Sequence, residues 1–152
     1  MKYRYYICDV FTETRFGGNP LAVLPKADGL SDHQMQQITR EFNFSETAFV
    51  FPAKAGHTRH VRIFTPGGEI PFAGHANVGN RIRSCQHRGI CEIDSSLTVR
   101  FEEEAGLVRV TIYREQGAAM RCEVAAPQSL SLGKTIDAQL VASAVSLSPE
   151  DI

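Results

Sequence analysis

The chain has 152 residues, 43% of them hydrophobic, which is enough for one domain with its own core. Its 16 basic and 17 acidic residues are spread along the sequence, so no basic stripe suits a nucleic acid. The N-terminus lacks the apolar core of a signal peptide, and no apolar run is long enough to cross a membrane. We therefore expect a cytoplasmic protein without a nucleic-acid or membrane partner.

The first predicted element is a strand over residues 5–12. Apolar side chains occupy both of its alternating faces, which is typical of a strand buried on both sides. A turn over residues 16–20, with two glycines, an asparagine and a proline, then leads into a second strand over residues 21–24. The sequence therefore opens with two strands joined by a tight, glycine-containing turn.

Residues 30–42 carry the clearest helix signal. Ser31 is a good N-cap, and Gln34 is placed to complete a capping box with it. Apolar residues recur at helical spacing behind this cap, which indicates a face directed to the core. These residues are Met35, Ile38 and Phe42.

Glu46 precedes an apolar run that predicts a strand over residues 47–51. Three aromatic residues, Phe44, Phe49 and Phe51, surround it in the sequence. A carboxylate in such a setting is a candidate for general acid and base catalysis. The alternative is a solvent-facing glutamate at the start of a strand.

His75 stands where the hydrophobic period changes from strand to helix. A strand segment over residues 61–64 runs into a Pro-Gly-Gly turn, and after Pro71 the pattern predicts a helix that opens at Gly74-His75. Free N–H groups at a helix N-terminus favour an anion, and their field should lower the pKa of His75. A neutral ring there suits a small carboxylate substrate, although the Gly-His pair could equally serve only to cap the turn.

The C-terminal third begins with an antiparallel hairpin. Alternating apolar residues predict strands over residues 97–102 and 108–113, joined by a charged turn, and residues 120–124 form a third strand. Alanines, serines and a proline over residues 125–133 predict a linker. A short helix over residues 136–145 follows.

Neither the cysteines nor the histidines suggest a metal site. His57 and His60 should fall on opposite faces of a strand, and no C-x-x-C spacing occurs. We therefore expect no metal, and free thiols rather than disulfides in a reducing compartment. The cysteines are Cys8, Cys85, Cys91 and Cys122.

Three motifs occur in a fixed order: FGGNPLAV at residues 16–23, NFSETAF at 43–49, and IFTP followed by EIPFAGHA within 63–76. Together they resemble the PhzF-like family of phenazine biosynthesis. The resemblance covers the whole chain but only about half of the family, its N-terminal half. It implies an α+β, diaminopimelate epimerase-like half, in which a curved mixed sheet wraps around a central helix. Residues 1–126 would form this domain, and 127–152 a linker and the start of a missing second half.

The resemblance also implies a chemistry. Family members isomerise small acids without a cofactor, and Glu46 would carry the proton between two carbons of the substrate. His75 and the backbone of Gly74 would hold the substrate carboxylate, and Asn19 and Ala76 would also line the site.

Family sites lie between two halves, so we expect a homodimer to supply what one half lacks. Two other functions remain open. One is a catalytically silent domain for assembly or for binding a small acid. The other is a cysteine-dependent racemase or epimerase that uses Cys85 or Cys91, although position 73, a cysteine in some relatives, is Ala73 here.

Overall fold

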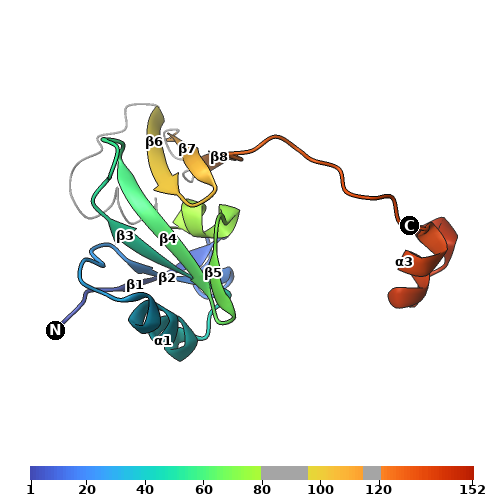
Figure 1. Ribbon diagram of the computed structural model, residues 1–152, viewed down its shortest axis with the longest axis horizontal. Helices are drawn as coiled ribbons and strands as arrows, with labels where there is room; N and C mark the ends of the chain where they lie inside the picture. The colour runs from blue at the N-terminus through green and yellow to red at the C-terminus, as the bar shows by residue number, and fades with distance from the viewer. Residues whose placement is uncertain (80–95, 115–120) are drawn as a thin grey trace.

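The computed structural model describes residues 1–79, 96–114 and 121–152 (Figure 1). Its strands are β1 (Tyr6–Val10), β2 (Asn19–Leu24), β3 (Glu46–Phe51), β4 (Arg59–Thr65), β5 (Gly68–Ile70), β6 (Ser96–Glu103), β7 (Gly106–Tyr113) and β8 (Arg121–Ala125). Its helices are α1 (Asp32–Phe42), α3 (Ala138–Ala144) and a 3₁₀ turn, η1 (Pro149–Asp151). Residues 74–79 are also helical.

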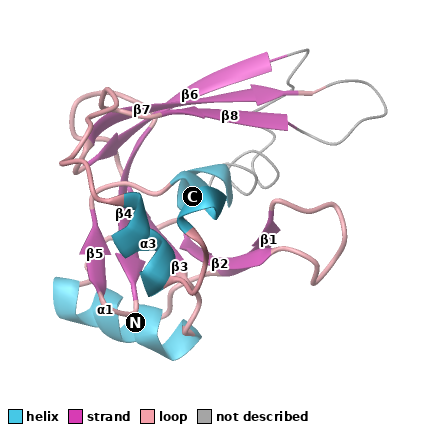
Figure 2. Ribbon diagram, turned by 90° about the vertical axis from the view of Figure 1, so that its right-hand side faces the viewer, coloured by secondary structure: helices cyan, strands magenta, loops and turns pink. Residues whose placement is uncertain are grey.

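The strands form one mixed sheet in the order β1-β2-β3-β4-β6-β7-β8, and β5 pairs with β4. The β2–β3 and β4–β6 pairs are parallel, and the other pairs are antiparallel. In Figure 2, β6, β7 and β8 run across the top of the molecule while β4 and β5 stand upright. This arrangement confirms the expected α+β class with a curved mixed sheet.

The core is organised around the start of the central helix. The helix opens at Gly74, as the change of period predicted, and in Figure 1 it lies between the β6–β8 strands and β1–β2. Ala73 and Ala76 pack there against buried residues of six strands, because small side chains let the helix approach the sheet closely. The predicted end of this helix, before His87, lies outside the described residues. The strand residues of this cluster include Val10, Leu21, Ala48, Val61, Phe101 and Val108.

The expectation that the first strand is buried on both faces is wrong. Cys8 and Val10 are buried, but Ile7 on the opposite face is 48% exposed. The strand ends at Val10, and Phe11 leaves it with a positive φ of 63°. The physical reason is that β1 is an edge strand with the core on one side only.

Helix α1 begins and ends as its sequence predicts. The Ser31 side chain accepts from the Gln34 N–H, and the Ser31 N–H donates to the Gln34 side chain. Asn43 ends the helix in the left-handed conformation, which turns the chain directly into β3. The apolar stripe packs on a second core cluster, so α1 fixes the point where β3 starts.

The predicted hairpin is confirmed as the antiparallel β6–β7 pair, and β8 pairs with β7. Phe101, Val108 and Val110 point into the core as the alternation predicted. Glu103, two residues beyond Phe101 on the same face of β6, is buried as well. A carboxylate therefore lies on the core side of the hairpin.

The C-terminal segment has few contacts with the sheet. Figure 1 shows an extended stretch that carries α3 away from the strands. Leu130 and Leu132 on this stretch are 90% and 88% exposed. The predicted last helix is confirmed, with the shorter bounds Ala138–Ala144.

Candidate active site

Two parallel strands bring candidate residues to one edge of the sheet. Asn19 is the first residue of β2 and Glu46 the first residue of β3, and Glu46 pairs with Leu21 in the parallel register. Gly18 lies so close to β1 that a Cβ atom there would be 2.3 Å from the Val10 carbonyl oxygen. Only glycine permits this approach, which places Asn19 beside Glu46.

The helix start lies opposite these strand ends and completes the cluster. His75 Nδ1 is 3.0 Å from Glu46 Oε2, and the backbone N–H of Ala76 donates to the same oxygen at 3.1 Å. His75 Nε2 is 3.2 Å from the carbonyl oxygen of Asn19. His75 is 9% exposed and the Glu46 side chain 17%, so the cluster is partly shielded from water. Four of the five expected site residues therefore meet.

The expected lowering of the His75 pKa is wrong. Burial does lower it, but the hydrogen bonds to the Glu46 carboxylate and the Asn19 carbonyl outweigh burial, and the net pKa of His75 is raised. Both ring nitrogens face acceptors, so the imidazolium can donate at each. The anion at the helix start is the protein's own Glu46, which is why the dipole argument alone gave the wrong sign.

Gly74, the fifth expected residue, contributes open space rather than a contact. A Cβ atom built on it would have no neighbour within 4 Å. The backbone of the helix start is therefore accessible on this side, directly next to His75.

Phe11 is a site neighbour that the sequence reasoning assigned to a buried strand. Its ring centroid is 5.8 Å from that of His75, and its side chain is 70% exposed. A phenylalanine with positive φ stores about 1–3 kcal/mol of strain, a state often found at functional sites. Phe11 could have been found from the sequence by its position at the end of the first strand, just before the glycine-containing turn.

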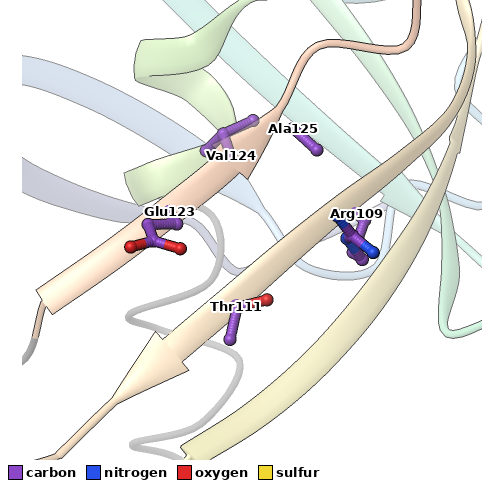
Figure 3. Close-up of a pocket in the computed structure, with 5 residues that line it drawn as sticks. All are labelled: Arg109, Thr111, Glu123, Val124 and Ala125. Carbon is purple, nitrogen blue, oxygen red and sulfur yellow. The ribbon is translucent and has the colours of Figure 1, made fainter.

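A cavity of about 310 Å³ lies elsewhere, on the β7–β8 strands (Figure 3). Figure 3 shows Arg109 and Thr111 on β7 opposite Glu123 on β8. None of the candidate site residues lines this cavity, and we assign it no catalytic role.

Other expectations concern cysteines, metals and membranes. Cys8 is buried and Cys122 packs against the main core, whereas Cys85 and Cys91 lie outside the described residues. In the described ranges no group of three or more His, Cys, Asp or Glu side chains is arranged to hold a metal ion. No helix in those ranges has the length and apolarity needed to span a membrane.

Several known proteins are similar to this chain in sequence or in structure. An uncharacterized isomerase of Mesorhizobium japonicum is 42% identical over 97% of this chain and 48% of its own length. The trans-2,3-dihydro-3-hydroxyanthranilate isomerase of Pseudomonas fluorescens is 34% identical over 82% of this chain and 43% of its own length. A solved structure described as a predicted epimerase of Pseudomonas aeruginosa is 31% identical, with a TM-score of 0.81, and is matched over 99% of this chain and 52% of its own.

The chain thus spans about half the length of these relatives. The solved structures of the predicted epimerase and of a probable proline racemase share the diaminopimelate epimerase-like fold of this chain. The family model described as phenazine biosynthesis-like protein matches residues 8–148. The chain therefore belongs to the phenazine biosynthesis-like, or PhzF, family.

Proposed function

We propose that this chain provides the acid and base half of a cofactor-independent isomerase for small, carboxylate-bearing substrates. The observation that carries the proposal is the contact of Glu46 Oε2 with both His75 Nδ1 and the Ala76 N–H. This contact holds a partly buried carboxylate in one orientation at an accessible backbone edge, as proton transfer requires.

In this proposal Glu46 moves a proton between two carbons of a conjugated acid. The carboxylate removes a proton, and the electron pair delocalises into the conjugated system. The carboxyl group formed in this way exchanges its proton with solvent and delivers a proton to another carbon. Atoms and electrons balance without a redox cofactor. Both hydrogen bonds described for Glu46 are to Oε2, so we assign the transfer to Oε1.

The helix start supports substrate binding in the same proposal. The open side of Gly74 gives a substrate oxygen access to backbone N–H groups. His75, with its raised pKa, adds positive charge beside that position and stabilises charge that develops on the substrate. The Asn19 carbonyl holds His75 and the Ala76 N–H holds Glu46, so both residues line the proposed substrate position.

We propose that the site is completed either by a second copy of the chain or by further residues of a longer protein. The relatives are about twice as long. The exposed apolar side chains of the C-terminal segment also favour burial against another surface. Light scattering at micromolar concentration tests the homodimer, and a monomer under those conditions excludes it.

The central test is deuterium incorporation from D₂O into a panel of small unsaturated acids, including trans-2,3-dihydro-3-hydroxyanthranilate. We expect incorporation with the wild type and its loss with Glu46→Gln, which removes the base and keeps the shape. Each variant is compared with the wild type by circular dichroism and thermal unfolding, so that loss of the fold is not mistaken for loss of chemistry.

Other outcomes select the alternatives. Loss of exchange in Cys85→Ala or Cys91→Ala, with full exchange in Glu46→Gln, supports a thiol-dependent racemase or epimerase. Binding of the acids without exchange by any protein supports a silent binding domain.

A further inference from the structure

A second carboxyl group, that of Glu103, lies next to Asn77 of the central helix, whereas Glu46 contacts His75 and Ala76. Glu103 ends β6 on its core face and is 9% exposed. Within the described residues neither of its carboxylate oxygens has a hydrogen-bond partner by geometry. An ionised carboxylate left in this state is strongly unfavourable, because burial removes water and nothing replaces it.

Asn77 of the central helix is the polar neighbour of Glu103. It is fully buried, and its Nδ2 donates to the carbonyl oxygen of Ala73 at 2.9 Å. Its Oδ1 accepts no hydrogen bond from the described part of the chain. Three of the four buried polar side-chain atoms that lack a partner in that part of the chain thus belong to Glu103 and Asn77.

One proton would satisfy all three atoms. A protonated carboxyl group donates through its O–H and accepts through its other oxygen, and a side-chain amide offers the matching acceptor and donor. Asn77 Nδ2 has two hydrogens, so it can serve Ala73 and Glu103 at once. Burial raises the pKa of Glu103 to about 7, against a partial offset from Asn77.

We propose that Glu103 is a neutral acid that pairs with the Asn77 side-chain amide and thereby positions the first turn of the helix that carries His75. The turn after Glu103 makes a second attachment, since the Ala105 N–H donates to the Pro71 carbonyl at 3.0 Å. Asn77 in turn holds Ala73 through both its side chain and its backbone N–H. The β6–β7 turn thus fixes the chain on both sides of Gly74.

The consequence for the site follows from this connection. Ala76 and His75 reach Glu46 only if the first helical turn keeps its place, so Glu103 is a positioning residue that acts through Asn77. Its effect on catalysis rests on the proposed function, whereas the pairing itself does not.

NMR titration of the whole chain tests the pairing without any substrate. Carbon-13 in the glutamate carboxyl groups reports Glu103, assigned by its disappearance in Glu103→Gln, and the imidazole signals report His75. We expect the Glu103 carboxyl to titrate near neutral pH. Glu103→Gln keeps a donor and an acceptor, so His75 should titrate as in the wild type. Glu103→Ala should lower the titration midpoint of His75, because the contact with Glu46 loosens.

Glu104→Gln is the matched control, since Glu104 is the exposed next residue, and it should leave both signals unchanged. If Glu103→Ala does not fold, Asn77→Asp supplies the second variant, which replaces the amide by a second carboxyl group and should shift both titrations. A Glu103 carboxyl that titrates near its ordinary value overturns the proposal. So does a His75 titration that is the same in wild type, Glu103→Ala and Asn77→Asp. The NMR titrations of Glu103 and His75 do not depend on deuterium exchange. The proposed pairing and the proposed isomerase function can therefore fail independently.

Discussion

Two glutamates next to the same helix start have different surroundings. Glu46 lies beside an imidazole and a backbone N–H, and both donate to it. Glu103 lies in the core beside an amide and has no geometric partner in the described ranges. Burial opposes ionisation at the second position. We propose that the donors that reach a buried carboxyl group decide whether it acts as a base or as a neutral structural acid.

The largest expected effect compares the two carboxyl groups through the same replacement. Glu46→Gln should lower deuterium exchange by about 10²–10⁴-fold, the usual contribution of a general acid and base. Glu103→Gln keeps its hydrogen bonds and should lower exchange by less than about tenfold. Exchange rates of both variants, measured by mass spectrometry of the substrate, check this difference. Equal losses would mean that the two carboxyl groups do not differ in role.

The next effect is the pH dependence of stability. The pKa of Glu103 is raised to about 7 in the folded chain. As the pH rises, the unfolded chain therefore loses this proton at a lower pH than the folded chain does. The folded state therefore loses stability between about pH 4.5 and pH 7, by at most about 3 kcal/mol. Urea unfolding of the wild type and Glu103→Gln at pH 5 and pH 8 measures it. We expect the free energy of unfolding of Glu103→Gln to rise relative to that of the wild type between pH 5 and pH 8. An equal difference between the two proteins at both pH values contradicts this.

A smaller effect separates the open and packed sides of the central helix. At Gly79 a Cβ atom would be 2.4 Å from Leu21 Cδ2 and 2.8 Å from Val10 Cγ2, so Gly79→Ala should destabilise the fold by about 1–3 kcal/mol. Gly74→Ala has open space and should leave stability within about 0.5 kcal/mol. It should nevertheless raise KM in the exchange assay, because the methyl group occupies the proposed substrate position. Thermal unfolding and KM of both variants give the test.

The smallest effect concerns the partner of Glu46. The pKa of His75 is raised by its hydrogen bonds to Glu46 and Asn19 despite burial, so Glu46→Gln should lower it. A raised histidine pKa stabilises the fold below the ordinary value and loses this contribution as pH rises through the folded pKa. The stability difference between wild type and Glu46→Gln attributable to His75 should therefore vanish at alkaline pH. An unchanged imidazole titration in Glu46→Gln would show that Glu46 does not raise the pKa of His75.

Local patterns in the sequence were sufficient for most of the elements. The capping residues of α1, the alternation in β6 and β7 and the change of period before Gly74 are short-range signals, because each depends on neighbouring residues. The three motifs likewise led to Glu46, His75 and Asn19, which the structure brings together. The sequence pattern assigned Glu103 to the charged turn after residue 102, and only the structure places it at the end of β6 with its side chain buried.

Only the tertiary structure decided the protonation of the site. The pKa of His75 depends on the Glu46 carboxylate, 29 residues away in the sequence, and on the Asn19 carbonyl, which together outweigh burial. The sequence argument considered only the field of the helix start. The single buried face of β1 likewise depends on its place at the edge of the sheet. Sequence patterns determine local conformation, whereas burial and charge act over distances that only the folded chain sets.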